Sequence, residues 1–415
     1  MVKLQLLLFF VLLVNSNTLF SQEVDSITYW QDIQPIIYNK CVPCHNPSGT
    51  APFSLLKESD VYKRAKFIAY VTRTKYMPPW KADPAYQTYM NERVLDAETI
   101  DIIQKWYITG LKKGVKPQSP TYLIEENKEE EEPDLILRME KPFNIPNTNK
   151  EEFRFFNVPT NLPTDTFISK IKFIPNNKLQ LHHSRVMADT TNLIRGIDGL
   201  SEQDPKVAEF QKNPLADEFM YGWVPGNEGI IFPEGSGKKI YANTDIILNI
   251  HYAPSSIEQE DQSAVALYFV KQPIKKEVKT LALNENYIVN QPFYIPANRI
   301  STFYMNYGPS TTDISLISII PHMHYLGKKF KAYAVTPSKA IIPLIKIDDW
   351  DFNWQSTYQF KTLLKIPKGS HIIVEGVYDN TTDNPANINF PPKDVAYGWN
   401  STDEMFNFII YYLEE

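Results

Sequence analysis

Short runs of β-branched and aromatic residues, separated by clusters of Pro, Asn, Asp and Gly, fill residues 135–415. Short strands at regular spacing with turn residues between them are typical of antiparallel β-sandwiches. A stretch of about 280 residues favours two such domains over one, and we place them at residues 135–272 and 273–415. The clearest predicted strands are Phe153–Val158, Phe167–Phe173, Asp245–His251, Val265–Val270, Phe330–Val335, Ile372–Tyr378 and Phe406–Tyr412.

Residues 23–118 show a different pattern, with apolar residues at helical spacing. We therefore expect an all-α N-terminal domain ahead of two jelly-roll-like antiparallel β-sandwiches. Between them, residues 119–134 contain Glu129-Glu130-Glu131-Glu132, a charge run that predicts a solvated acidic linker. The predicted helices of the first domain are Ile33–Tyr38, Ser59–Thr72 and Asp96–Thr109.

Residues 1–22 predict a secretory signal peptide. They combine an early Lys3, an apolar run from Leu4 to Val14 and small polar residues before Ser21. That run is too short to span a bilayer, and no later run is long and apolar enough, so we expect an exported protein without a membrane span. The net charge of -6 argues against nucleic acid as a partner.

The two cysteines of the chain lie in Cys41-Val42-Pro43-Cys44-His45. This is the pattern of c-type haem attachment, in which both thiols bind the haem covalently and the histidine ligates the iron. A redox dithiol or a chance match is the alternative interpretation. For the second axial ligand we favour Met77, in Met77-Pro78-Pro79-Trp80, over Met90, with plain core packing as the alternative for Met77.

Residues 33–114, with this motif and the Met-Pro-Pro-Trp loop, resemble the small one-haem cytochrome c domains of exported bacterial proteins. The resemblance implies one covalently attached haem c and a periplasmic or extracellular location in a bacterium.

Histidines mark the sandwich region. His322 and His324 follow the apolar run Ile314–Ile320, and on an extended strand both side chains would project from one face and reach one metal ion. His182 and His183 are adjacent, so they can share a metal only if the strand bends or bulges there. His251 ends a predicted strand. Each of these histidines could instead be a solvated or packed core residue.

The order of these histidines, followed by Glu404-Met405-Phe406-Asn407, resembles the copper type II, ascorbate-dependent monooxygenases. That family includes peptidylglycine α-hydroxylating monooxygenase and dopamine β-monooxygenase. The similarity extends over residues 135–415 and includes His324-Tyr325-Leu326-Gly327 and Asp349-Trp350-Asp351-Phe352-Asn353-Trp354-Gln355.

The resemblance implies two copper ions. An electron-transfer copper would be held in the first sandwich by His182, His183 and His251. An oxygen-activating copper would be held in the second sandwich by His322, His324 and Met405. Imidazole suits both copper oxidation states, and a thioether favours Cu(I), the state that meets O2. His371 matches no ligand of the family, and we assign it no metal role.

Two departures from the family limit the prediction. Its soluble members carry disulfides, whereas both cysteines here belong to the haem motif. In the peptide-amidating enzymes an arginine two residues before the His-x-His pair anchors a substrate carboxylate, and here that position is Ile320. Asn407 matches a substrate-side asparagine, but Ile409 replaces the tyrosine expected next. A glycine-extended peptide is therefore a doubtful substrate.

The sequence thus predicts a copper-dependent monooxygenase that hydroxylates a C-H bond of a small molecule or peptide with O2. Electrons would come through the haem, from ascorbate or from a redox protein. The alternative from another functional class is a non-catalytic haem and copper electron carrier. A further alternative is a haem-bearing carbohydrate-binding sandwich, which predicts no copper.

Overall fold

The computed structural model describes residues 27–47, 49, 51–90, 92–118, 131–210, 218–227, 229–398 and 400–415. The predicted signal peptide at residues 1–22 and residues 119–130 of the predicted linker lie outside these described residues.

The named elements of the described N-terminal part are all helices, joined by longer irregular segments. It consists of a π-helical turn, η1 (Tyr29–Ile33), and the helices α1 (Gln34–Lys40), α2 (Glu58–Arg73) and α3 (Ala97–Ile108). Helix α3 begins at the N-cap Asp96, whose side chain accepts a hydrogen bond from Thr99 N at 2.7 Å. The inner faces of these helices enclose a small core around the fully buried Trp106 and Tyr29.

The first sandwich has two sheets around one apolar core. One sheet has the order β1-β11-β4-β8-β12, with β7 paired to β4, and the other has the order β3-β9-β5-β6. Strands β2 and β10 form a separate pair. The elements are β1 (Leu135–Arg138), β2 (Phe143–Ile145), β3 (Glu152–Pro159), β4 (Thr166–Ile174), β5 (Leu181–Asp189), η2 (Leu193–Gly196), α4 (Pro205–Phe210), β6 (Glu218–Trp223), β7 (Ile230–Ile231), β8 (Ser236–Ile240), β9 (Asp245–Tyr252), β10 (Gln259–Asp261), β11 (Ala264–Phe269) and β12 (Lys276–Glu277).

The second sandwich is also built from two sheets, of order β13-β22-β16-β19 and β15-β20-β17-β18, with β14 and β21 as a separate pair. Every strand pair of these two sheets is antiparallel. The elements are β13 (Lys279–Leu283), η3 (Glu285–Tyr287), β14 (Tyr294–Ile295), β15 (Arg299–Tyr307), β16 (Ile314–His322), β17 (Gly327–Val335), β18 (Ile341–Ile347), β19 (Tyr358–Ile366), β20 (His371–Asn380), β21 (Val395–Ala396) and β22 (Asn407–Glu414).

The sheet β13-β22-β16-β19 lies between the two cores. On β16, Leu316 and Ile319 belong to the core of the second sandwich, while Ile317 and Ile320 pack into the core of the first. This explains why all nine residues of β16 are buried and why its apolar residues do not alternate with exposed polar ones.

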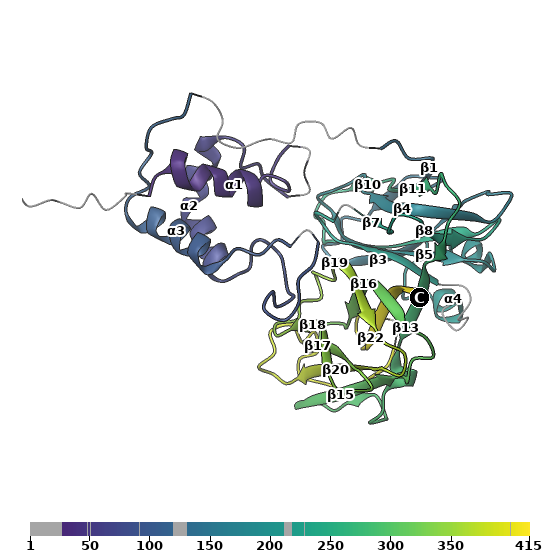
Figure 1. Cartoon of the computed structure of the whole chain (residues 1–415). Helices are drawn as coiled ribbons and strands as arrows, with labels where there is room; N and C mark the ends of the chain where they lie inside the picture. The colour runs from purple at the N-terminus through teal and green to yellow at the C-terminus, as the bar shows by residue number, and fades with distance from the viewer. Residues whose placement is uncertain are drawn as a thin grey trace, which may run out of the picture.

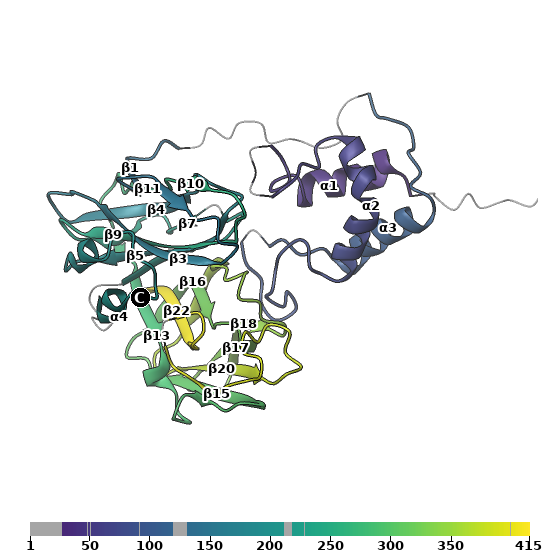
Figure 2. The ribbon, with the colours of Figure 1, turned by 180° about the vertical axis from the view of Figure 1, so that it is seen from behind.

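A strap of residues 76–95 leads from α2 across to the second sandwich before the chain returns to α3. Tyr89 is buried in the core of that sandwich and forms an isolated bridge with Phe360. Asp83 pairs with Lys346 at 3.1 Å, and Lys81 pairs with Asp349 at 3.0 Å. Both ribbon views show the helices beside the sandwiches, joined to them by this strap (Figures 1 and 2).

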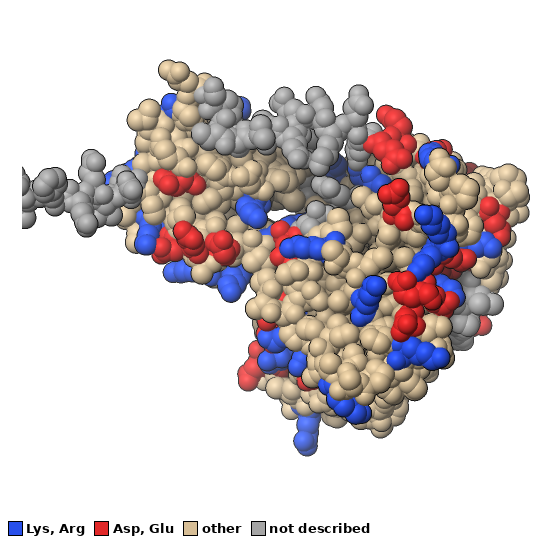
Figure 3. Space-filling model, in the orientation of Figure 1, with Lys and Arg blue, Asp and Glu red and all other residues tan. Residues whose placement is uncertain are grey.

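Acidic and basic side chains are mixed over the sandwich face seen in Figure 3. Within the described residues, none of the helices is long and apolar enough to cross a membrane.

Candidate metal centres

A β-bulge brings three histidines of the first sandwich together. Strands β5 and β9 pair antiparallel with His183 opposite His251 and Leu181 opposite Tyr252, so His182 is the extra residue of a bulge. The bulge removes the alternation that would otherwise send His182 to the far face of the sheet. The ring centroids of His182 and His183 lie 4.9 Å and 4.8 Å from that of His251. We call these three residues the first candidate centre.

The donor atoms of this centre suit a metal ion. His251 is completely buried and lies under the ring of Phe153, with centroids 3.9 Å apart and planes at 11°. Among the described residues, His251 Nε2 and His182 Nδ1 are buried and have no hydrogen-bond partner. Buried polar atoms normally find a partner, so these two nitrogens fit the donor set of a bound cation.

Burial also keeps these imidazoles neutral. It lowers the pKa of His182 to about 4, lowers that of His183 well below its usual range, and lowers that of His251 despite the neighbouring Glu151. Neutral imidazoles offer lone pairs at neutral pH, as metal binding requires.

Glu151 adjoins this centre, and our sequence analysis missed it. The candidate ligand atoms of Glu151, His182 and His251 all lie within 4.8 Å of one another. Glu151 Oε2 is 3.6 Å from His251 Nε2 and accepts a hydrogen bond from Tyr325 Oη at 2.9 Å. Glu151 directly precedes β3 in a polar stretch, and nothing in that stretch distinguishes it from Glu152.

The second candidate centre forms where β16 meets β22, and it consists of His322, His324 and Met405. His322 ends β16 opposite Asn407, while His324 lies two residues beyond the strand and Met405 two residues before β22. The expectation that both histidines lie on one extended strand is therefore wrong for His324. Strand pairing ends at His322 and the turn follows at Tyr325 and Leu326, yet the ring centroids of His322 and His324 are 5.1 Å apart.

Hydrogen bonds orient both histidines of this centre. Nδ1 of His322 donates to Gln355 Oε1, and Nδ1 of His324 donates to the Asp403 carbonyl at 3.1 Å. These bonds leave Nε2 of each ring with its lone pair, and His322 Nε2 is buried without a hydrogen-bond partner among the described residues. Burial lowers the pKa of His324 to about 4 and that of His322 well below its usual range.

Glu404 fixes the backbone of this centre. It is completely buried, and its Oε2 accepts hydrogen bonds from His324 N at 2.9 Å and Met405 N at 3.2 Å, while Oε1 accepts one from Leu326 N at 2.6 Å. Burial raises its pKa to about 8 in spite of these donors. One carboxylate thus joins two segments 80 residues apart.

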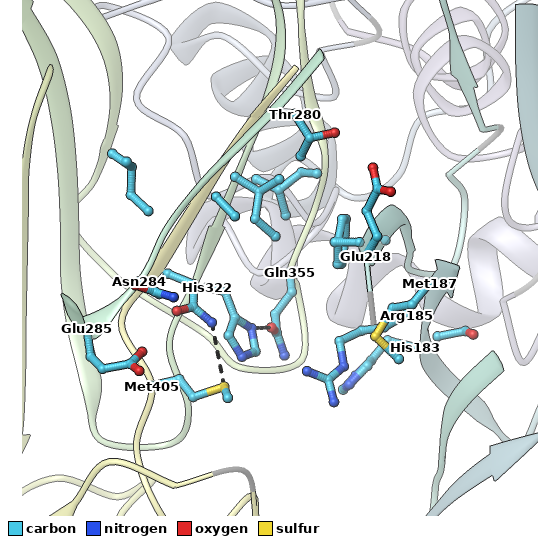
Figure 4. A pocket seen from close by; sticks show the side chains of 18 of the residues that line it. His183, Arg185, Met187, Glu218, Thr280, Asn284, Glu285, His322, Gln355 and Met405 are labelled. Atoms are coloured by element: carbon cyan, nitrogen blue, oxygen red, sulfur yellow. Dashed lines mark hydrogen bonds between the residues drawn. The ribbon is translucent and has the colours of Figure 1, made fainter. Parts of the chain in front are cut away.

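The two centres face one cavity of about 1350 Å³, whose lining includes His183 from the first centre and His322 and Met405 from the second. Figure 4 shows His322, Gln355 and Met405 on one side of this space and His183 and Arg185 on the other. The lining also contains Ile320, the residue at the position of the family's substrate-anchoring arginine.

Phe352 stands between the two centres. Its ring centroid lies 5.5 Å from that of His183 in the first sandwich and 5.6 Å from that of His324 in the second. It also packs on Tyr325, at 4.3 Å. The His183 and His324 rings can therefore be no farther apart than the sum of the first two distances.

The predicted haem residues lie after α1. Cys41 and Cys44 are free thiols, and burial raises the pKa of Cys41 to about 12. Nδ1 of His45 bonds the Phe53 carbonyl at 3.0 Å, which leaves Nε2 for a metal.

Met77 follows α2 in the turn before the strap, with its N donating to Val71 O at 3.1 Å. The rival Met90 bonds the backbone of Gln359 in the second sandwich and is 40% exposed.

The remaining histidine lies elsewhere. His371 begins β20, in the outer sheet of the second sandwich, and its Nδ1 bonds Asn306 Oδ1 at 3.0 Å.

Comparison with known proteins finds similarity to copper enzymes in the C-terminal part of the chain. Residues 295–415 match the C-terminal domain of the copper type II ascorbate-dependent monooxygenases. The chain is 25% identical over 242 residues to DBH-like monooxygenase protein 2 of Homo sapiens, an alignment covering 52% of this chain and 46% of that protein. The chain thus spans less than half the length of this relative. The VP2 subviral particle of infectious bursal disease virus is 9% identical, with a TM-score of 0.19 over 68% of this chain and 73% of its own.

Proposed function

We propose that this protein is an exported copper-dependent monooxygenase that uses O2 to hydroxylate a C-H bond of a substrate bound in the cavity between the two sandwiches. The observation that carries the proposal is the convergence of two histidine centres on that one cavity, which holds His183 on one side and His322 with Met405 on the other. The match of residues 295–415 to the monooxygenase domain supports the same function.

Copper bound at His322, His324 and Met405 would supply the oxygen chemistry, in which a C-H bond, O2, two electrons and two protons give an alcohol and water. The residues of the chain prepare that site. Gln355 and the Asp403 carbonyl hold the two Nδ1 protons, so that both Nε2 lone pairs are available. The Met405 thioether is a soft donor that favours Cu(I).

The first candidate centre would hold the second copper and pass electrons. Its rings are neutral, and the Phe352 ring packs against both His183 of this centre and His324 of the second centre. Because Phe352 contacts a histidine of each centre, electrons would pass between the centres through packed side chains beside the cavity.

A covalent haem c at Cys41, Cys44 and His45, with Met77 as second ligand, would supply one-electron transfer to the first centre. The position of Cys44 supports this. A β-carbon added at Gly226, in the loop after β6, would lie 2.8 Å from the Cys44 sulfur. Strand β6 ends at Trp223, which pairs with Ser184, the residue after His183. The haem thioether would thus adjoin a short stretch of chain that leads to the first centre.

The substrate class follows from what the cavity presents. At Ile320 it offers an apolar side chain in place of the arginine that binds a peptide carboxylate, so we expect a substrate without a free carboxylate at this point. Ascorbate or a redox protein would reduce the haem or the copper from outside.

The test is oxygen uptake by the protein loaded with copper and haem, supplied with ascorbate and a panel of small molecules and peptides. We expect substrate-dependent uptake and a product that carries one oxygen atom from labelled O2. His324→Ala should abolish both the substrate-dependent oxygen uptake and the labelled product. Fully loaded protein that consumes no O2 with any substrate would favour the electron-carrier alternative, and protein that binds no copper would exclude both.

A further inference from the structure

Arg185 lines the cavity between the sandwiches, and neither candidate centre uses it as a ligand. It lies on β5 two residues after His183, so both side chains project from the same face of the strand. Among the described residues that line the cavity, it is the only lysine or arginine. Figure 4 shows its guanidinium beside His183, across the space from His322 and Met405. The wall formed by the first sandwich therefore presents a cation to the cavity.

We infer that Arg185 anchors a carboxylate group of the substrate. The acid end of the substrate would lie on the first sandwich, and the carbon to be hydroxylated would lie toward His322 and Met405 on the second. This inference rests on the proposed function and deepens it, because it names a carboxylate-bearing molecule as the substrate. The proposed function excludes a carboxylate only at Ile320, on the second sandwich, where the lining side chain is apolar.

The two strands beside β5 hold Arg185 and leave it uncovered on one flank. On β9 it is paired with the buried Asn249, and Arg185 Nε donates a hydrogen bond to Asn249 Oδ1 at 2.9 Å. On β6 it is paired with Gly222, which has no side chain and also lines the cavity. The Nε bond fixes one edge of the guanidinium, so a ligand would meet the two terminal nitrogens. These nitrogens form a planar fork that matches the two oxygens of a carboxylate.

The charge of Arg185 acts across the cavity. Burial is the main reason for the lowered pKa values of His322 and His324, and the Arg185 charge lowers both of them further. Arg185 also lowers the pKa of Glu202, but burial outweighs this effect and raises that pKa to about 7. Glu202 is therefore only partly ionised at neutral pH, and it neutralises only part of the Arg185 charge.

The acids that line the cavity do not cancel this cation. Glu218 pairs with Lys238 at 2.6 Å, and burial raises the pKa of Glu285, which favours its neutral form. The lining also contains Thr280 Oγ1 and Asn407 Oδ1, and both are buried without a hydrogen-bond partner among the described residues. Buried polar atoms normally find a partner, so the cavity suits a ligand with polar groups as well as an acid end.

The test measures equilibrium binding to copper-loaded, full-length protein by isothermal titration calorimetry. The probes are phenyl-substituted straight-chain carboxylic acids, from phenylacetic acid to phenylhexanoic acid, each compared with its uncharged carboxamide. The variants are Arg185→Gln and Arg185→Lys. The control is Arg138→Gln, which removes one positive charge from the exposed side of β1, where Arg138 donates to the Gln262 carbonyl at 2.9 Å. Circular dichroism checks that each variant is folded.

We expect at least one acid of the series to bind roughly tenfold or more tightly than its amide. Arg185→Gln should weaken binding of that acid by about tenfold or more and leave amide binding unchanged, because only the carboxylate loses a charged partner. Arg185→Lys keeps the charge and should restore part of the affinity, and Arg138→Gln should change neither probe. A series in which no acid binds more tightly than its amide would overturn the inference. Equal losses for acid and amide in Arg185→Gln would overturn it too, since Arg185 would then serve only to hold the sheet.

Ascorbate is also an anion, so reduction of Cu(II) by ascorbate is measured separately. If Arg185→Gln raises the ascorbate concentration needed for half-maximal reduction and leaves acid binding unchanged, Arg185 binds the reductant and the inference is wrong. Oxygen uptake that occurs only with uncharged substrates would overturn the inference and leave the proposed function intact. Acid binding that depends on Arg185, in protein that consumes no O2 with any substrate, would support the carboxylate site and contradict the proposed function.

Discussion

The sulfur of Cys44 lies against the backbone of Gly226, although the first belongs to the helical part and the second to a loop of the first sandwich. Arg93 closes the same junction by donating hydrogen bonds to the carbonyls of Pro225, at 3.4 Å, and Gly226. Gly226 has a φ of +83°, and a side chain there would meet both Cys44 and Arg93. The contact requires a glycine for both reasons.

Gly226→Ala should therefore separate the proposed haem from the first copper. We expect slower re-oxidation of reduced haem by bound Cu(II), followed by stopped-flow absorbance. Gly199→Ala is the control, because Gly199 has a similar φ of +77° but open space around it. Both changes should cost about 1–2 kcal/mol of stability from the left-handed backbone. Equal electron-transfer rates in the two variants would contradict an electron route through this junction.

Gln355 should be needed for copper binding at the second centre because it accepts the Nδ1 proton of His322. Gln355→Leu removes the acceptor and frees the ring to rotate or change tautomer. Copper affinity at this centre should fall roughly 10- to 100-fold. Gln355→Glu keeps an acceptor oxygen and should restore most of the affinity. Competition with a Cu(I) chelator measures the copper affinity of both variants. If both lose the same affinity, the hydrogen bond to His322 is not the reason for the loss.

Glu404 should matter for folding as well as for metal binding. Glu404→Gln places an amide NH2 against backbone N-H groups of His324, Met405 or Leu326, and so leaves buried donors unpaired. Each unpaired donor should lower the free energy of unfolding by about 1–3 kcal/mol, which urea unfolding would show as a lower midpoint. The exposed Glu414, paired with Lys279 at 2.7 Å, is the control, and Glu414→Gln should cost about 1 kcal/mol at most. Similar losses at the two sites would contradict this role.

Glu202 should make stability depend on pH. It is 8% exposed, and burial raises its pKa to about 7, above its usual value near 4.5. The folded state thus binds more protons than the unfolded state between these values, and stability should fall as pH rises from about 5 through 7. When Glu202 is fully ionised, the loss of unfolding free energy should reach about 3 kcal/mol. Glu202→Gln cannot ionise and should not show this loss.

Urea unfolding of the wild type and Glu202→Gln at pH 5 and pH 8 measures the effect. The two proteins should differ more at pH 8, with the variant the more stable. If the difference in unfolding free energy between the two proteins is the same at both pH values, the effect of residue 202 comes from its hydrogen bond with Ser401 Oγ, at 3.3 Å, and not from its charge.

Local patterns in the sequence predicted three helices and seven strands, and each of them is present in the structure. The helix expected at Ser59–Thr72 is α2, Glu58–Arg73, and the strand expected at Asp245–His251 is β9, Asp245–Tyr252. Hydrophobic spacing sufficed because each element buries one face or both. The bulge that lets His182 join His183 was also foreseen as a geometric requirement, because two adjacent residues cannot otherwise share a face.

The contacts that complete the centres could not be predicted in this way. Glu151 reaches the first centre through the pairing of β3 with β9, and Glu202 reaches Ser401 from nearly 200 residues away. Such contacts depend on strand register and on the packing of one sandwich against the other, which leave no periodic trace in the sequence. The end of β16 at His322 was not predicted because a His-x-His spacing looks the same in a strand and in a loop.

The placement of β16 and β22 between two cores has a mechanical consequence. Ile320 and Ile409 from these strands complete the core of the first sandwich, while their neighbours Ile319 and Ile410 complete that of the second. The sandwiches therefore share a wall and cannot swing apart without exposing both interiors. This packing holds the two candidate centres at a fixed separation, and a substrate of the proposed enzyme would be accommodated by the side chains of the cavity, not by domain opening.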